Sequence, residues 1–427
     1  MTEAGTKQPA KAAATHVYVK RTTCRACGGS TLLRFLELGP QPLANAFPAD
    51  PSGFESEARY PLDVHFCEDC SLVQVLDVID PEVLFRDYIY VTGTSTTISE
   101  HNRRYANTVV ELVPLRPHDL VVEVASNDGS LLRCFQPYGV RTLGIEPASN
   151  IAKIAREAGV ETIDEFFEPW IARAVKAERG AAKAVIGNNV LAHVDDTQGF
   201  LEGFRDLLAP DGLAVVEVPY IGELVDRLEY DTVYHEHLCY FSVTTLMRLC
   251  EAVGLSLRRI DHVPVHGGSI RMYAGRTDSF GAHDPAVIEE SAAEAARGLT
   301  SFATYRELAA GVEANRAAVI GLLRRLNEEG STVAAYGAPA KGNTLLNYCG
   351  VTTDLLPYTV DRNPMKVGRY TPGTHIPVLP VETLLERQPD YILILAWNFA
   401  DEIMEQQSEY RSRGGRFILP IPEPEIV

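Results

Sequence analysis

The densest group of titratable side chains in the sequence is the run Tyr234-His235-Glu236-His237. Histidine is the side chain best matched to proton transfer near neutral pH, and a neighbouring carboxylate can orient its ring or stabilise its charged form. The run therefore predicts acid–base chemistry, centred on His237. A buried polar cluster or a helix cap would have the same composition. A metal pair of the two histidines would need a third ligand, and none is spaced nearby.

Four of the eight cysteines form two CxxC pairs, Cys24-Arg-Ala-Cys27 and Cys67-Glu-Asp-Cys70. Two such pairs can bring four thiolates together around Zn²⁺, and a closed four-thiolate site has no open position for a substrate. The spacing predicts one structural zinc ion, in preference to a redox pair or buried free thiols. The other cysteines are scattered and are expected in the core: Cys134, Cys239, Cys250 and Cys349.

The elements that position these groups begin with a zinc-binding ribbon. We expect it over residues 1–80, with residues 38–47 (LGPQPLANAF) as the loop between the cysteine pairs and residues 64–79 (VHFCEDCSLVQVLDVI) as a strand-rich segment. Strand and helix patterns then alternate, which predicts a parallel sheet that binds its ligand at the carboxyl ends of the strands. The fold class is therefore α/β.

A nucleoside site is expected at that edge. Residues 120–135 (LVVEVASNDGSLLRCF) change from an apolar strand, through a polar turn, to a helix, whose N-terminus offers free amides. Glu146 ends the next strand, where a carboxylate can accept hydrogen bonds from both ribose hydroxyls. Residues 161–167 (ETIDEFF) supply an aromatic turn that suits an adenine ring, and residues 182–194 form another buried strand that ends in Asn188 and Asn189.

A second Rossmann-like half follows helical residues 284–329. Residues 331–348 (STVAAYGAPAKGNTLLNY) are expected to form a strand, a glycine-containing loop and a helix, able to hold a phosphate through amides and Lys341. The loop lacks the GxxxxGK[ST] spacing, so hydrolysis of a nucleoside triphosphate is not indicated. We expect a central domain over 81–275 and a C-terminal domain over 276–427.

The charge balance limits the partners. The 427 residues contain 57 Asp and Glu against 39 Lys and Arg, a net charge of −18. A surface of this charge repels nucleic acid and anionic membranes unless it carries a basic patch, and no such patch is visible. No apolar run is long enough to span a bilayer and no export signal is present. We expect a cytoplasmic protein that acts on a small molecule, as a monomer or weak dimer.

Several motifs resemble known families. The segments VVEVASNDGSLL, GIEP and NNVLAHV resemble the S-adenosylmethionine (SAM) pockets of class I methyltransferases, although Ala125 stands where those enzymes usually have the first loop glycine. Together with CRACGG, CEDC, YIYVTGTS, YHEHLCYFS, VHGGSIRMY and AYGAPAKGN, they resemble the sugar-nucleotide C-methyltransferases of antibiotic deoxysugar pathways. That resemblance covers nearly the whole chain.

The resemblance implies three domains, a SAM cofactor and methylation at C-3 of a dTDP-4-keto-deoxysugar. The ketone makes the C-3 proton acidic, a general base removes it, and the enolate carbon takes the methyl group without a catalytic metal. The implied base is His237, with Tyr234 and Glu236 as polar neighbours and His193 as a donor to the enolate oxygen or a capping histidine.

Further positions carry over from the motifs. The cofactor would contact Glu123, Ala125, Asn127, Gly129, Glu146, Pro147, Phe166, Asn188 and Asn189. Tyr88 is a further catalytic candidate, and the substrate would contact Tyr90, Lys341 and Asn398. Tyr88 and Tyr90 would share one face of an extended segment, as two core tyrosines also would.

Two alternatives stay open. One is a methyltransferase that acts on oxygen or nitrogen of another small sugar nucleotide or natural product; loss of His237 would then be mild, because no enolate forms. The other is a zinc-ribbon module that binds nucleic acid or a protein partner, against which the net charge argues.

Overall fold

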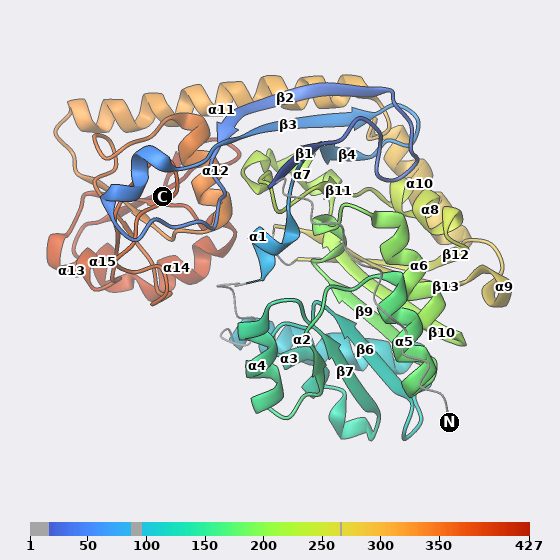
Figure 1. Cartoon of the computed structure of the whole chain (residues 1–427). Coiled ribbons are helices and arrows are strands. Elements are labelled where there is room, and N and C mark those ends of the chain that lie inside the picture. The colour runs from blue at the N-terminus through green and yellow to red at the C-terminus, as the bar shows by residue number, and fades with distance from the viewer. Residues whose placement is uncertain (1–16, 87–95, 265–266) are drawn as a thin grey trace.

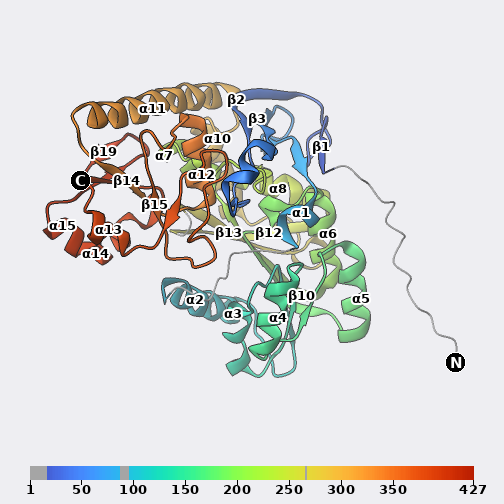
Figure 2. The same cartoon turned by 60° about the vertical axis from the view of Figure 1, so that its left-hand side comes forward.

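The computed structural model describes residues 17–86, 96–264 and 267–427. An N-terminal group of strands runs along one side of the molecule, and the central and C-terminal parts lie beneath it (Figures 1 and 2). The long helix α11 (Phe302–Glu328) lies beside strand β2 (Leu32–Gln41) and extends over the C-terminal part. The expected Tyr88 and Tyr90 lie outside the described residues.

The N-terminal strands form the expected ribbon. They are β1 (Tyr18–Lys20), β2, β3 (Tyr60–Cys67), β4 (Val73–Val75) and β5 (Asp77–Ile79). The expectation that residues 38–47 form a loop is wrong for its first four residues. Strand β2 continues to Gln41 because Pro40 and Gln41 pair with the start of β3.

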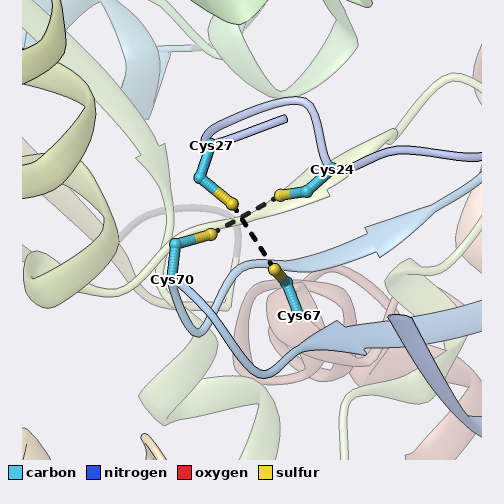
Figure 3. Close-up of side chains that lie close together, drawn as sticks. All are labelled: Cys24, Cys27, Cys67 and Cys70. Atoms are coloured by element: carbon cyan, nitrogen blue, oxygen red, sulfur yellow. Dashed lines mark hydrogen bonds between the residues drawn. The ribbon is translucent and has the colours of Figure 1, made fainter. Parts of the chain in front are cut away.

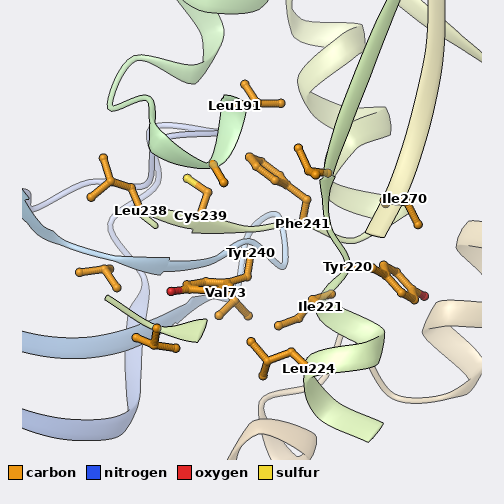
Figure 4. Close-up of a cluster of buried hydrophobic side chains, with 14 of the residues drawn as sticks. Val73, Leu191, Tyr220, Ile221, Leu224, Leu238, Cys239, Tyr240, Phe241 and Ile270 are labelled. Carbon is orange, nitrogen blue, oxygen red and sulfur yellow. The ribbon is translucent and has the colours of Figure 1, made fainter. Parts of the chain in front are cut away.

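The four-stranded sheet of this ribbon includes a strand from a distant part of the chain. Its order is β11-β4-β3-β2, in which β11 is Cys239–Tyr240, directly after the YHEHL segment. Cys239 pairs with Gln74 and Tyr240 with Val73, in an antiparallel arrangement. Apolar side chains close around this junction, among them Leu238, Cys239 and Phe241 (Figure 4). The histidine motif therefore leads directly into a strand of the zinc-ribbon sheet.

The central sheet has the order β12-β13-β10-β9-β6-β7-β8. Its strands are β6 (Leu120–Val124), β7 (Arg141–Ile145), β8 (Thr162–Ile163), β9 (Ala182–Asn188), β10 (Leu208–Pro219), β12 (Leu255–Val263) and β13 (Ser269–Arg276). The strands from β8 to β10 are parallel, as the alternation predicts. Strands β12 and β13 are antiparallel, so the sheet is mixed and two more strands follow the histidine motif.

Helices cover this sheet and connect its strands. The α-helices are α1 (Pro81–Phe85), α2 (Thr96–Leu112), α3 (Ser130–Arg133), α4 (Ser149–Glu157), α5 (Pro169–Arg179), α6 (Thr197–Leu207), α7 (Ile221–Arg227), α8 (Val243–Ala252) and α9 (Thr277–Phe280). Two short 3-10 helices matter for the site: η4 (Leu191–His193) and η5 (Tyr230–Thr232). Helix α3 has only four residues, shorter than its apolar pattern suggests.

The C-terminal part is a second Rossmann-like sheet of order β16-β15-β14-β17-β18-β19. It follows α10 (Pro285–Ala296) and α11, and its strands are β14 (Val333–Tyr336), β15 (Thr359–Val360), β16 (Val378–Leu379), β17 (Tyr391–Ile394), β18 (Arg416–Leu419) and β19 (Glu425–Ile426). Only β19 pairs antiparallel. Its helices include α12 (Ala340–Cys349), α13 (Thr383–Arg387), α14 (Ala400–Gln406) and α15 (Ser408–Ser412).

The expected α/β class is confirmed in three parts: a ribbon that carries four clustered cysteines, a central mixed sheet and a second Rossmann-like sheet. Within the part of the chain that the structure describes, no helix has both the length and the apolar character needed to cross a bilayer.

Candidate active site

A cavity of about 880 Å³ lies where the three parts of the chain meet. Its walls come from the N-terminal ribbon (Asn45), the carboxyl ends of the central strands, the histidine motif and the C-terminal loop around Lys341. A cavity of this size can enclose a nucleoside cofactor together with part of a second ligand.

The loop between β6 and α3 forms one wall with an unusual backbone. Ala125, Asn127 and Gly129 all adopt positive φ, at 54°, 47° and 71°. An alanine in the left-handed region is strained, and such strain persists where the surroundings enforce it. Gly129 is also required sterically, because a Cβ there would lie 2.8 Å from a Val160 methyl carbon. The loop thus keeps its backbone close to the cavity, with alanine in place of the first glycine.

Glu146 fixes this loop. Its Oε2 accepts a hydrogen bond from the Asn127 amide and its Oε1 one from the Ala148 amide, both at 2.8 Å. Burial raises the pKa of this carboxyl, and the two amides oppose that shift. Each oxygen keeps a second lone pair, so the carboxylate can still accept from two ribose hydroxyls.

Five other expected cofactor residues line the cavity as Ala125, Asn127 and Glu146 do: Glu123, Pro147, Phe166, Asn188 and Asn189. Gly129 is not among the described lining residues, so it shapes the loop without facing the cavity. Burial, and then Asp128 and Glu146, raise the pKa of Glu123 well above its usual range. Buried side-chain oxygens of Glu123, Asn188 and Asn189 have no hydrogen-bond partner in the described structure. Such orphaned acceptors fit a ligand that brings several donors, as the amino and hydroxyl groups of SAM do.

His237 is held in one tautomer. Its Nδ1 lies 2.8 Å from the Thr232 carbonyl oxygen, which can only accept, so Nδ1 carries a proton. In the neutral ring, Nε2 is then an acceptor for the Tyr234 hydroxyl, at 2.8 Å. The two rings are tilted against each other with centroids 4.0 Å apart. This arrangement leaves a basic nitrogen paired with a phenol in the cavity wall.

The other two members of the motif point elsewhere. The side chain of Glu236 is buried and its Oε1 accepts a hydrogen bond from Asn45 of the ribbon at 2.7 Å. His235 is buried and its Nε2 donates to the Pro61 carbonyl, so its position agrees with the expectation that its side chain turns away from His237. The motif therefore faces the cavity with Tyr234 and His237 and binds the ribbon with the other two residues.

His193 lies at the end of η4, and its ring centroid is 4.9 Å from that of His237. Burial lowers the pKa of His193 to about 4. Its Nδ1 is buried without a partner in the described structure. A neutral imidazole beside His237 can donate a hydrogen bond to an oxygen of the acceptor without releasing its proton.

Lys341 and Asn398, from the C-terminal part of the chain, also line the cavity. The Lys341 ammonium lies 4.5 Å from the centre of the Trp397 ring, and its nitrogen has no hydrogen-bond partner in the described ranges. It follows a loop that leads into the N-terminus of α12. An ammonium group and free helix amides together can hold an anion.

Sequence reasoning missed three features of the cavity. The Thr232 carbonyl fixes the tautomer of His237, and only the folded turn brings it there. Glu229 lines the wall, and burial raises its pKa to about 8 although Lys341 opposes the shift. Arg86 stacks on Phe166 and donates to the Pro147 carbonyl. No motif marks these residues, but Glu229 and Thr232 lie within eight positions of His237.

The four cysteine sulfurs converge as a metal site requires (Figure 3). All lie within 4.8 Å of one another, with Cys24 and Cys70 sulfurs 3.5 Å apart and Cys27 and Cys67 sulfurs 3.6 Å apart. Tetrahedral zinc with Zn–S bonds of about 2.3 Å would separate its ligands by about 3.8 Å. The residues therefore fit one zinc ion. Of the other cysteines, Cys239, Cys250 and Cys349 are buried as expected and Cys134 is half-buried.

Profiles of three protein families match successive regions: a zinc binding domain over residues 24–85, a methyltransferase domain over 98–260 and a C-methyltransferase C-terminal domain over 264–422. The C-methyltransferase NovU of Streptomyces niveus is 40% identical over 404 residues, which cover 95% of this chain and 96% of that protein. The chain belongs to the SAM-dependent C-methyltransferase family. SAM and zinc are therefore its cofactors.

Solved structures resemble part of this C-methyltransferase at low identity. The PH0226 protein of Pyrococcus horikoshii OT3 is 14% identical and covers 46% of this chain and 96% of its own, with a TM-score of 0.36. Magnesium protoporphyrin IX methyltransferase of Synechocystis PCC 6803, solved with bound SAM, is 15% identical and covers 44% of this chain and 88% of its own, with a TM-score of 0.33.

Transfer to carbon is the activity of the family to which this chain belongs. The two alternatives, a methyltransferase for oxygen or nitrogen and a zinc-ribbon binding module, are therefore set aside.

We expect Cys70→Ser to remove the zinc and to lower the melting temperature of the C-methyltransferase by roughly 10 °C, because a structural zinc site contributes its binding energy to folding. Atomic emission and calorimetry would measure both quantities. Cys134→Ser is the matched control, since Cys134 is half-buried and outside the cluster. Full zinc content in Cys70→Ser would contradict the assignment of the four ligands.

Glu146→Gln should weaken SAM binding at least tenfold, or about 1.4 kcal/mol. An amide in this position presents its own NH₂ group to the Asn127 or Ala148 amide, so one of the two hydrogen bonds is lost. Isothermal titration with SAM would give the affinity. Glu161→Gln, at an exposed carboxylate in the same region, is the control. Equal affinities for the two variants would show that Glu146 does not organise the loop.

Histidine titration followed by NMR should give a pKa near 4 for His193. Because the unfolded chain takes up a proton below about pH 6.5 and the buried ring does not, the contribution of His193 to the free energy of unfolding should fall as the pH drops from about 6.5 to 4. Burial lowers the pKa of His65 and His235 as well, which adds to this slope. The raised pKa values of Glu123 and Glu229 oppose it. A pKa of His193 near 6.5 would mean that water reaches the ring.

Proposed function

We propose that this enzyme methylates C-3 of a dTDP-linked 4-keto-deoxysugar, as in antibiotic deoxysugar pathways. The observation that carries the proposal is the pair of Tyr234 and His237, with a defined tautomer, in the wall of the cavity that Lys341 also lines. Transfer to carbon needs a carbanion equivalent, which a ketone beside a C–H bond provides once a base is present. A sugar nucleotide would bring both the ketone and a diphosphate.

His237 would accept the C-3 proton at Nε2, which already accepts a hydrogen bond from Tyr234. The Thr232 carbonyl holds the Nδ1 proton and stabilises the imidazolium that results. Tyr234 would act as the relay between C-3 and this nitrogen or as the neighbour that the sugar displaces. His193 would donate a hydrogen bond to the 4-oxygen as negative charge develops there.

SAM supplies the electrophilic methyl group when it is bound. The cavity wall that would receive it contains the carboxyl groups of Glu123 and Glu146. A sulfonium cation bound beside them would favour their ionised forms. Glu146 and the Ala125–Gly129 loop would hold the nucleoside, and Asn188 and Asn189 the polar groups of the amino acid part.

The diphosphate would lie against the N-terminus of α12 and Lys341, with Asn398 nearby on the same wall. The cavity is continuous from this wall to Tyr234 and His237. Within the proposed mechanism, the C-terminal part binds the nucleotide, the central part binds SAM, and the histidine motif works between them. We expect the limits given above to apply: 1–80 for the zinc ribbon, 81–275 for the part that binds SAM and carries the histidine motif, and 276–427 for the part that binds the nucleotide.

The test is mass spectrometry of the protein with SAM and a panel of dTDP-4-keto-2,6-dideoxysugars in heavy water. We expect one sugar to gain a methyl group when SAM is present, and deuterium to enter C-3 of that sugar when SAM is left out. His237→Asn should lower both rates about 100-fold or more while SAM affinity is unchanged. Tyr234→Phe distinguishes the two roles of Tyr234, since only a relay requires the hydroxyl for exchange.

His262→Gln is the control, because His262 is an exposed histidine paired with Glu290 and outside the cavity lining. Deuterium exchange without methylation would support the base and point to a different sugar. If no ketosugar is exchanged or methylated while SAM binds, the proposed substrate class is wrong.

A further inference from the structure

Arg25 stands between the two cysteines of the first zinc knuckle, and its side chain is completely buried. Its Nε donates to Oδ1 of Asp195 at 3.0 Å. Asp195 lines the active-site cavity and follows His193 by two residues. One end of the guanidinium therefore holds the segment that carries His193.

The other end of the same guanidinium holds β4. Its Nη1 donates to the Val75 carbonyl and to the Gln74 side-chain oxygen, the latter at 3.2 Å. Gln74 is the register partner of Cys239, two residues after His237. Arg25 thus bridges the strand that positions His237 and the segment that positions His193.

The knuckle backbone strengthens this bridge. The Arg25 carbonyl accepts from the Thr197 hydroxyl at 3.1 Å, and the Ala26 carbonyl accepts from the Gln198 amide at 2.7 Å. Both donors lie in the first turn of α6, which begins two residues after Asp195. The two residues between Cys24 and Cys27 therefore make three separate contacts with residues 195–198.

Two backbone hydrogen bonds connect the segment after His237 with the segment before His193 and with β4. The Leu238 amide donates to the Ala192 carbonyl at 2.7 Å, and the Val75 amide donates to the Leu238 carbonyl at 3.0 Å. Leu238 and Leu191 both belong to the apolar cluster around β11 (Figure 4). The segments that carry His193 and His237, whose ring centroids are 4.9 Å apart, are thus held by contacts with the knuckle and β4, while Thr232 and Tyr234 hold the His237 ring itself.

We propose that Arg25 is a positioning residue and that the zinc knuckle sets the separation of His193 and His237. Zinc would close the Cys24–Cys27 turn and so fix the Arg25 backbone, from which the guanidinium reaches both segments. The proposal goes beyond a role of zinc in stability alone. Only the expected effect on the reaction rate rests on the proposed function, because the environments of the two rings are measured by NMR without the reaction.

The test compares Arg25→Lys with Arg34→Lys in the full-length, zinc-loaded protein with SAM bound. Lysine keeps the charge but lacks the planar guanidinium group, so it cannot donate hydrogen bonds to Asp195 and to the Val75 carbonyl at the same time. Arg34 forms an exposed pair with Asp63 in the same ribbon and serves as the matched control. Zinc content, SAM affinity, imidazole ¹H–¹⁵N spectra and the kcat and KM for the sugar are measured.

For Arg25→Lys we expect one zinc per chain, unchanged SAM affinity, shifted imidazole resonances of both His193 and His237, and a kcat at least tenfold lower with KM within about twofold. Asp195→Asn, which leaves the knuckle intact, should shift His193 and lower kcat in the same direction. It keeps the proposal testable if Arg25→Lys loses zinc.

Unchanged imidazole spectra and kcat in Arg25→Lys and Asp195→Asn would overturn the proposal. Loss of rate with unchanged imidazole spectra would also overturn it, since the rings would not have moved. Failure of the proposed function has a different signature: the unaltered protein would bind SAM but neither exchange nor methylate any ketosugar, while the imidazole shifts of Arg25→Lys would still support positioning.

Discussion

Strand β11 has only two residues, yet its pairing with β4 ties the histidine motif to the zinc ribbon. The register places Cys239 opposite Gln74, so His237 keeps a fixed distance from the second cysteine pair. Apolar side chains from the ribbon, η4 and α7 bury the junction (Figure 4). A short strand gains little from its own hydrogen bonds, and the surrounding core holds it in place.

Burial also decides the chemistry of the groups around that junction. Removal from water disfavours charge, so it lowers the pKa of His193 and raises that of Glu123 and Glu229. His193 is therefore a neutral donor next to His237. Several carboxyl groups can share the cavity because burial favours their neutral forms, whereas hydrogen bonds from backbone amides favour the ionised form of Glu146.

The C-terminal sheet completes the site through contacts that no sequence motif predicts. The Trp397 indole donates to Asp231 in η5 at 2.7 Å, and the Thr344 hydroxyl donates to the Val233 carbonyl at 3.0 Å. The η5 turn also presents the Thr232 carbonyl to His237. Docking of the C-terminal part thus reaches the turn that fixes the histidine tautomer, which links nucleotide recognition to the base through one short segment.

The sequence alone determined the four sulfur ligands, the strand–turn–helix segments and the β-α alternation, because these follow from local spacing and periodicity. It also indicated His237 and Glu146 from their residue types and places. Tertiary structure alone decided that β11 joins the ribbon, that β12 and β13 are antiparallel, and that Arg25 connects two histidine segments. The place of β11 and the contacts of Arg25 depend on residues up to 170 positions apart, for which a single chain carries no local signal. Strands β12 and β13 pair locally, but the pairing of β13 with β10 again joins separate parts of the chain.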